Sequence, residues 1–257
     1  MAKDPDSSSI VEFRGAGFSV DGGHTLVSGL NFTIRQGETL VLLGRSGSGK
    51  TTTLKLVNRL LEPTEGEVLI EGRATTDWDP IRLRRHVGYA IQEVGLFPHF
   101  SVGRNIGLVP AIEHWPAERI QSRVRELMIL VGLDPQLASR YPRELSGGQR
   151  QRVGVARALA ADPPILLMDE PFGALDPITR AEIQREFQAL KQRLNKTIVF
   201  VTHDLREALL IATRIGFFEA GRLLGVYTPA QFMSTTDRVA SQYLASFRTG
   251  NNWPEYK

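Results

Sequence analysis

The pattern of apolar and polar residues changes along the chain, and the change predicts an α/β protein. Residues 10–43 hold short β-type runs separated by glycine-containing turns, at 11–14, 25–27, 31–34 and 38–43. We expect these runs to form an antiparallel sheet that partly faces solvent. An apolar strand over 40–43 then leads into a glycine-rich loop and apolar residues at helical spacing: Leu54, Val57, Leu60 and Leu61. This order predicts a strand–loop–helix unit.

A second helical region begins at Pro116, a residue that suits the first turn of a helix. One face of this helix would carry Ile120, Val124, Leu127, Met128 and Val131. We interpret it as part of an inserted helical subdomain of about residues 94–160. Alternation then resumes with strands at 165–168 and 197–201 and helices at 179–194 and 205–213. Such alternation predicts parallel strands joined by right-handed crossovers.

We expect one domain over residues 10–245, with a flexible tail at 1–9 before it and a second tail at 246–257 after it. The composition agrees with one such domain. The chain has 257 residues, 42% of them hydrophobic and 23% charged, which is enough to bury a sizeable core. It has no cysteine, which excludes disulfides, thiolate metal sites and cysteine nucleophiles. No run approaches the about 20 apolar residues of a membrane-spanning helix. The polar start lacks the apolar stretch of a signal peptide, so we expect a cytoplasmic protein.

The first chemical motif is a phosphate-binding loop that lies between the predicted strand and helix. It fits the pattern G-x-x-x-x-G-K-[ST] and consists of Gly44, Arg45, Ser46, Gly47, Ser48, Gly49, Lys50 and Thr51, with Thr52 next in the helix. Glycines let backbone N–H groups turn toward phosphates, and the helix start adds its positive end. Lys50 would reach the β and γ phosphates of a nucleotide, and the Thr51 hydroxyl would bind Mg²⁺. The alternative is a glycine- and serine-rich turn that only caps a helix.

A second strand supplies acidic partners for that metal. The apolar run at 165–168 ends in Asp169 and Glu170, which is the Walker B pattern. Asp169 would hold Mg²⁺ through its water shell, and Glu170 could act as a general base on the attacking water. The alternative is a buried strand whose two acidic residues only meet solvent at its end.

Residues 145–149, Leu-Ser-Gly-Gly-Gln, distinguish this chain from other phosphate-loop proteins. With this motif, residues 10–245 resemble the ABC ATPase family. Ser146 is a good N-cap, and Gly147, Gly148 and Gln149 would place backbone amides at the start of a helix over 150–159. The resemblance implies a phosphate-loop α/β fold with a mixed sheet core, an antiparallel β subdomain and the helical insertion. It also implies a pair of identical subunits in which this motif faces the partner's phosphate loop and bound ATP.

The resemblance implies further site residues. Gln92 fits the glutamine that senses Mg²⁺ and the γ-phosphate, Asp176 fits an acidic contact between the two subunits, and His203 fits the histidine that orients Glu170 and the water. One position departs from the family, because Val20 stands where an aromatic residue usually stacks on adenine. Phe18 lies two residues earlier on the same strand face and could substitute, or it could belong to the core.

The transport role also follows from the resemblance. Residues 92–116 and 153–163 look like the ATPases of bacterial importers for glycine betaine, choline or carnitine, so we expect transmembrane permease subunits, a substrate-binding protein and a place on the cytoplasmic face of the cell membrane. The permease would dock near residues 93–116, where Leu96 and Phe97 are apolar, although these two could instead pack in the core. We expect neither nucleic-acid binding nor the C-terminal regulatory module of related ATPases.

Other functions are open to a chain with these motifs. An exporter or lipid-transport ATPase would carry the same residues. A soluble ABC protein of DNA repair or translation would need coiled-coil arms or two ATPase units in one chain, which this sequence lacks. A phosphate-loop kinase would have no use for residues 145–149.

Overall fold

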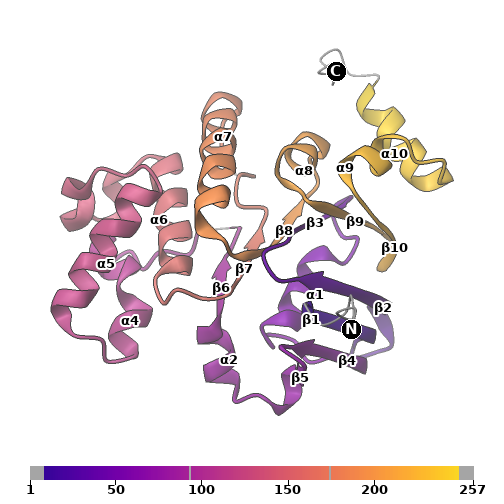
Figure 1. The fold of residues 1–257 in the computed structure, drawn as a ribbon, viewed down its shortest axis with the longest axis horizontal. Coiled ribbons are helices and arrows are strands. Elements are labelled where there is room, and N and C mark those ends of the chain that lie inside the picture. Colours follow the sequence, from indigo (N-terminus) through magenta and orange to yellow (C-terminus); the bar gives the residue numbers. More distant parts are fainter. Residues whose placement is uncertain (1–8, 93, 174, 249–257) are drawn as a thin grey trace, which may run out of the picture.

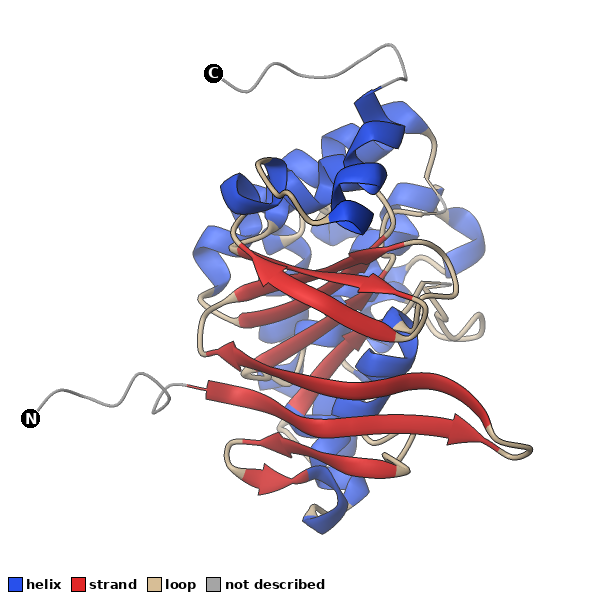
Figure 2. Ribbon diagram, turned by 90° about the vertical axis from the view of Figure 1, so that its right-hand side faces the viewer, coloured by secondary structure: helices blue, strands red, loops and turns tan. Residues whose placement is uncertain are grey.

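Two sheets with one helix between them form the framework of the molecule (Figures 1 and 2). The computed structural model describes residues 9–92, 94–173 and 175–248. The predicted tails therefore lie almost entirely outside the described residues, as do Glu93 and Ala174. The last described helix ends at Arg248, so the expected boundary at residue 245 falls inside it.

The first sheet is antiparallel, as predicted, and its strands follow the order β2-β1-β4-β5. Its strands are β1 (Ser9–Val20), β2 (His24–Arg35), β4 (Glu65–Ile70) and β5 (Arg73–Ala74). The expected short runs within residues 11–34 are wrong, because they belong to two strands of 12 residues each. Gly15 and Gly29 have φ angles of 59° and 60°, and the pairing register shifts between Phe13 and Ala16. These two glycines therefore lie at irregularities within the strands, whereas the glycine-containing segments 21–23 and 36–37 form turns, as predicted.

The second sheet has the order β10-β9-β3-β8-β7-β6. Its first strand along the chain is β3 (Thr39–Gly44), and the others are β6 (Val87–Ala90), β7 (Ile165–Asp169), β8 (Thr197–Thr202), β9 (Arg214–Glu219) and β10 (Arg222–Tyr227). All neighbouring pairs are parallel except β9 and β10. The mixed character of the sheet agrees with the sequence prediction, and β3, β7 and β8 are buried along their whole length. Strands covered on both faces need such continuous apolar runs.

Helix α1 (Lys50–Val57) contacts β2 and β4 of one sheet and β3, β7 and β8 of the other. Its residues Leu54, Leu56 and Val57 are fully buried in the core that joins the two sheets. The other face of the second sheet packs against a second core, to which α6, α7 and α8 contribute. The phosphate-binding loop thus leads into a helix that both sheets hold in place.

Helices, 3-10 turns and loops make up the described chain between Val94 and Ala160. Figure 1 shows this part to one side of the second sheet. It contains α3 (Val102–Ile106), α4 (Leu108–Ile112), α5 (Ala117–Leu130), η2 (Pro135–Ser139), η3 (Pro142–Glu144) and α6 (Gly147–Leu159). Helix α5 buries Val124, Leu127 and Met128, which confirms the predicted apolar face.

Several predicted helix bounds need correction. Helix α1 ends at Val57, so the predicted helical pattern does not continue through Leu60 and Leu61. Helix α7 (Pro177–Leu194) begins two residues before the predicted start at 179, because Asp176 caps it.

Helix α6 begins at Gly147 rather than at residue 150, because Ser146 and Gln149 form a reciprocal capping box. Helix α8 (Leu205–Ile211) ends before Thr213. The Thr213 hydroxyl accepts a hydrogen bond from the Thr39 N–H at 2.9 Å, which leads the chain into β9.

The remaining described helices connect or follow the strands of the two sheets. They are η1 (Thr75–Asp77), α2 (Pro80–His86), α7 (Pro177–Leu194), α9 (Pro229–Met233) and α10 (Arg238–Arg248). Among the helices described, none is both long and apolar enough to cross a bilayer.

Candidate active site

The phosphate-binding loop lies between the end of β3 and the start of α1, as predicted, and neighbouring loops hold its shape. Gly49 caps α1 in the left-handed conformation, with φ at 97°. The turn between β9 and β10 supports the loop from outside: the Gly221 N–H donates to the Ser48 carbonyl at 3.2 Å, and the Gly221 carbonyl accepts from the Ser28 N–H at 2.9 Å. Three chain segments far apart in sequence thus fix one loop.

Lys50 points back over this loop and is only 4% exposed. Its Nζ donates to the carbonyl oxygens of Gly44 at 2.8 Å and Arg45 at 2.7 Å. Burial lowers the pKa of the Lys50 ammonium, and the negative charges of Glu170 and Asp169 oppose that shift. The loop therefore holds a buried amine that faces two carboxylates across the site.

Asp169 ends β7 and lies beside α1. One carboxylate oxygen accepts from the Thr51 hydroxyl at 2.8 Å, and the other accepts from the Tyr89 hydroxyl at 3.2 Å. Burial raises the pKa of the Asp169 carboxyl, while these two hydrogen bonds act to lower it. The orientation of this carboxylate is fixed at both oxygens.

Thr51 and Asp169 fit a magnesium site. Mg²⁺ prefers oxygen ligands, keeps several waters and takes phosphate oxygens of its substrate, so one hydroxyl and one carboxylate are a sufficient protein contribution. Their oxygens are 2.8 Å apart beside the loop. No group of three or more His, Cys, Asp or Glu residues able to hold a metal is found within the described ranges.

Glu170 follows Asp169 directly and adopts a positive φ of 43°. Its Oε2 lies 3.1 Å from Nδ1 of His203 and accepts from Nε2 of Gln92 at a longer 3.4 Å. Three strand ends, those of β6, β7 and β8, bring these three side chains to one edge of the sheet. The carboxyl ends of adjacent parallel strands are the usual place for such a gathering.

The predicted signature residues lie apart from this cluster. The Ser146 hydroxyl accepts from the Gln149 N–H at 3.2 Å, and the Gln149 side chain accepts from the Ser146 N–H at 2.9 Å. A Cβ atom on Gly148 would lie 2.9 Å from Cγ2 of Thr179 in α7, so the tip of α6 lies against that helix. No hydrogen bond or ion pair joins residues 146–149 to the phosphate loop in the part of the chain that the structure describes.

Asp176 caps helix α7 and accepts from the backbone N–H groups of Ile178 and Thr179 at 3.2 and 3.1 Å. Hydrogen bonding with Thr179 lowers the pKa of the Asp176 carboxyl. Val20 ends β1 and is 40% exposed, whereas Phe18 is partly buried against the core between the sheets. The core alternative for Phe18 therefore agrees with its packing.

Sequence reasoning missed two tyrosines that support the site. The Tyr89 hydroxyl donates to Asp169, and the Tyr243 hydroxyl donates to the backbone carbonyl of His203 at 2.8 Å. Tyr89 lies in β6, three residues before Gln92, and could have been suspected from that position. Tyr243 lies in α10, 40 residues after His203, and nothing in the local sequence points to it.

The loop, the paired acidic residues and the histidine at one sheet edge define a nucleotide-binding ATPase cassette, and comparison with known proteins gives the family. The ABC transporter family matches residues 27–173, and the chain belongs to that family. It is 52% identical over 212 residues to the glycine betaine/carnitine/choline transport ATP-binding protein OpuCA of Bacillus subtilis. It is 48% identical over 226 residues to the glycine betaine uptake system ATP-binding protein YehX of Escherichia coli.

Solved structures show the same fold. CbiO1 from Clostridium perfringens, part of an ABC transporter complex, matches with a TM-score of 0.81 at 26% identity, over 94% of this chain and 97% of that one. A dimeric ATP-binding cassette in a post-hydrolysis state with ADP and Pi matches with a TM-score of 0.77 at 33% identity, over 85% of this chain and 98% of that one. The matched region covers 82% of this chain but 56% of OpuCA, and 88% of this chain and 72% of YehX. The chain thus spans little more than half the length of OpuCA.

Proposed function

We propose that this chain is the ATP-hydrolysing subunit of a membrane importer and that the imported cargo is a quaternary-amine osmoprotectant. The observation that carries the ATPase role is the position of Glu170, which contacts His203 and Gln92 one residue from the Asp169–Thr51 pair. The cargo rests on relatives that are 48–52% identical and are named for glycine betaine, carnitine or choline transport or for osmoprotectant import. Nothing among these relatives favours an exporter, a lipid transporter or a DNA-repair protein.

The phosphate loop binds the phosphates of ATP. Backbone amides of residues 44–49 and the start of α1 surround them, Thr52 extends the same helix turn, and Lys50 exchanges its two carbonyl partners for phosphate oxygens. Thr51 would bind Mg²⁺, Asp169 would hold it through its water shell, and the metal would screen phosphate charge. Gln92, which donates to Glu170 at 3.4 Å, would sense the metal and the γ-phosphate. Val20, at the end of β1, would contact the adenine by apolar packing alone.

Glu170 takes a proton from the attacking water as general base. His203 holds the Glu170 carboxylate at 3.1 Å and so orients both the base and the water toward the γ-phosphate. A hydrogen bond joins the residues on either side of His203, since the Asp204 N–H donates to the Thr202 hydroxyl at 2.9 Å. This bond restrains the backbone that carries the imidazole.

A second copy of the chain completes each site. The tip of α6, formed by Ser146, Gly147, Gly148 and Gln149, presents backbone amides without a lysine of its own, which suits a phosphate held by another copy. Asp176, at the start of the neighbouring helix α7, lies in the contact between copies. The dimeric cassette that is 33% identical to this chain supports such a pair.

The permease subunits dock beside the glutamine segment, and the complex includes a substrate-binding protein outside the membrane. Phe97 is 41% exposed there, whereas Leu96 packs partly against the core. Asn105 is fully buried and its side-chain amide bonds the Phe97 carbonyl and N–H, while Arg157 donates to the carbonyls of Val94 and Gly95. An exposed apolar side chain such as Phe97, on a backbone that is held by hydrogen bonds, suits a protein partner on the cytoplasmic face of the membrane.

Substitution of the general base tests the ATPase role. Glu170→Gln keeps the shape of the side chain but cannot accept the proton, so we expect steady-state ATP hydrolysis to fall by about 100-fold or more while ATP binding persists. Glu182→Gln, at an exposed site on α7, is the matched control and should hydrolyse ATP at the normal rate. Normal hydrolysis by Glu170→Gln would remove the proposed role of that carboxylate.

Uptake by whole cells tests the cargo. Cells that carry the complete transporter with this chain should accumulate radiolabelled glycine betaine or choline at high salt, and cells with Glu170→Gln should not. Hydrolysis in the purified complex without any difference in uptake between the two strains would refute the quaternary-amine cargo and leave the ATPase role intact.

A further inference from the structure

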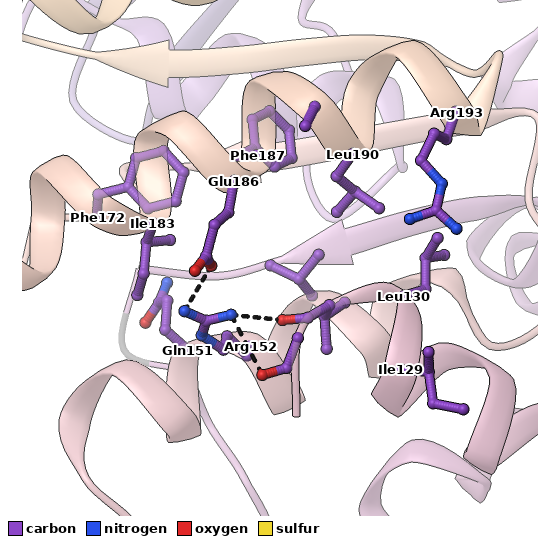
Figure 3. A pocket seen from close by; sticks show the side chains of 14 residues that line it. Ile129, Leu130, Gln151, Arg152, Phe172, Ile183, Glu186, Phe187, Leu190 and Arg193 are labelled. Atoms are coloured by element: carbon purple, nitrogen blue, oxygen red, sulfur yellow. Dashed lines mark hydrogen bonds and ion pairs between the residues drawn. The ribbon is translucent and has the colours of Figure 1, made fainter. Parts of the chain in front are cut away.

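A groove of about 280 Å³ lies between the helical part of the molecule and helix α7, away from the phosphate loop (Figure 3). Its walls come from the end of α5, the first half of α6 and the face of α7 that carries residues 183–193. Most of the side chains that line it are apolar: Ile129, Leu130, Val131, Val155, Phe172, Ile183, Phe187, Ala189 and Leu190. The volume is at the small end of the range of ligand pockets.

Gln151 provides the polar group at the inner wall of this groove. Its side chain is 4% exposed, and it forms no hydrogen bond or ion pair within the described ranges 9–92, 94–173 and 175–248. The amide is not among the side-chain polar atoms that are shut off from solvent without a partner, so it is accessible from the groove. A ligand with an oxygen or nitrogen atom at this point would form a hydrogen bond with it.

Two arginines line the groove, and they differ in whether their charge is paired. Arg152 is neutralised, because it pairs with Glu186 at 2.5 Å and donates to the Val131 carbonyl at 2.8 Å. Arg193 extends from α7 above Leu130, and in the described part of the chain its guanidinium has no hydrogen bond or ion pair (Figure 3). The groove therefore offers one uncompensated positive charge, one free amide and apolar walls.

We propose that this groove binds a small amphipathic carboxylate, such as a medium-chain fatty acid, and that binding changes the rate of ATP hydrolysis. The apolar chain would lie along Ile129, Leu130 and Leu190, the carboxylate would pair with Arg193, and the Gln151 amide would gain a partner. The charge favours an anion over a cation or a neutral alcohol of the same length.

The position of the groove explains why such a ligand would act on hydrolysis. It touches α6, whose first residues form the Ser146–Gln149 tip, and α7, whose N-cap is Asp176. A molecule bound between these two helices fixes their relative position, and a small shift there moves both elements that the second copy meets. The binding part of this proposal is independent of the proposed ATPase role, whereas the rate effect rests on it.

Calorimetric titration of the purified chain with decanoate, in the absence of nucleotide, tests the site. We expect saturable binding to one site, and binding weakened by about tenfold or more in Arg193→Glu, since a charge-assisted pair is replaced by repulsion. Arg185→Glu, on an exposed turn of the same helix outside the groove, is the matched control and should bind as the unchanged chain does. Gln151→Leu, which keeps the volume of the side chain, should also bind decanoate more weakly.

Three results would overturn the proposal. They are absence of saturable binding, equal binding by Arg193→Glu, and equal binding of decanol or decyltrimethylammonium, which would show only a non-specific apolar surface. ATP turnover of the assembled transporter should respond to decanoate in the unchanged chain and in Arg185→Glu but not in Arg193→Glu. Specific binding with no change in turnover would overturn the effect on hydrolysis.

Discussion

Gly49 is a position of the phosphate loop where a side chain would meet both an unfavourable backbone conformation and a packed wall. It caps α1 with φ at 97°. A Cβ atom there would lie 2.5 Å from Cγ1 of Val27 and 3.0 Å from the Leu26 carbonyl oxygen. Gly49→Ala must therefore either strain the loop or push β2 away from it.

The cost can be worked out from these contacts. An L-residue in the left-handed conformation costs about 1–2 kcal/mol. Forcing a methyl group into a packed wall adds about 1–3 kcal/mol. We expect Gly49→Ala to lower the free energy of unfolding by about 2–5 kcal/mol. Gly47 separates the two terms, since its φ is 79° but a Cβ atom there meets nothing within 4 Å. Gly47→Ala should lose only about 1–2 kcal/mol.

Urea unfolding followed by circular dichroism measures both variants in the same buffer, and an unchanged slope against urea shows that the unfolded states are comparable. The larger loss should belong to Gly49→Ala. Equal losses would contradict the reasoning, because they would mean that β2 does not restrain the loop.

Two further predictions concern buried acidic groups. Tyr89→Phe removes one of the two donors to Asp169, so the free energy of unfolding should fall by about 1–2 kcal/mol and half-maximal hydrolysis should need more Mg²⁺; unchanged values for both would show that Tyr89 does not support this carboxylate. Burial raises the pKa of Glu207 above 4.5, although Thr202 and Gln184 donate to it. The stabilisation from its protonated form is complete below pH 4.5 and is lost as pH rises through the raised folded pKa. The melting temperature of Glu207→Gln should therefore fall less with rising pH than that of the unchanged chain. The same dependence of melting temperature on pH in both proteins would contradict this prediction.

Local motifs were predictable from the sequence, because their residues are adjacent in the chain. The strand, glycine loop and helix over 40–57 needed only eight consecutive loop residues with an apolar run before them and a helical pattern after them. Glu170 was a candidate because it follows the apolar strand and Asp169, whereas His203 and Gln92 came from resemblance to a family. Their approach depends on strands that are 33 and 78 residues apart in sequence, and no local pattern encodes that pairing.

The elements and contacts that the sequence did not predict also depend on residues far apart in the chain. The runs predicted at 11–14, 25–27 and 31–34 were too short, because Gly15 and Gly29 lie at irregularities inside two long strands. Strand β9 was missed because its six residues follow directly on a helical pattern, and tertiary pairing with β3 decides its conformation. Tyr243 supports the backbone of His203 from a helix near the end of the described chain, a contact that only the folded structure shows.

The central claim is that each ATP site is shared between two copies, and mixing two inactive variants tests it most directly. Lys50→Ala disables the phosphate loop, and Gly147→Asp places a negative charge at the tip of α6, where a Cβ atom has room at 3.7 Å from Leu175. A mixed pair would contain one intact site only if the loop of one copy meets the tip of the other. The account predicts that the equimolar mixture regains hydrolysis, up to about a quarter of the normal rate, if the copies pair at random in a symmetric dimer. A mixture as inactive as each variant alone would contradict it.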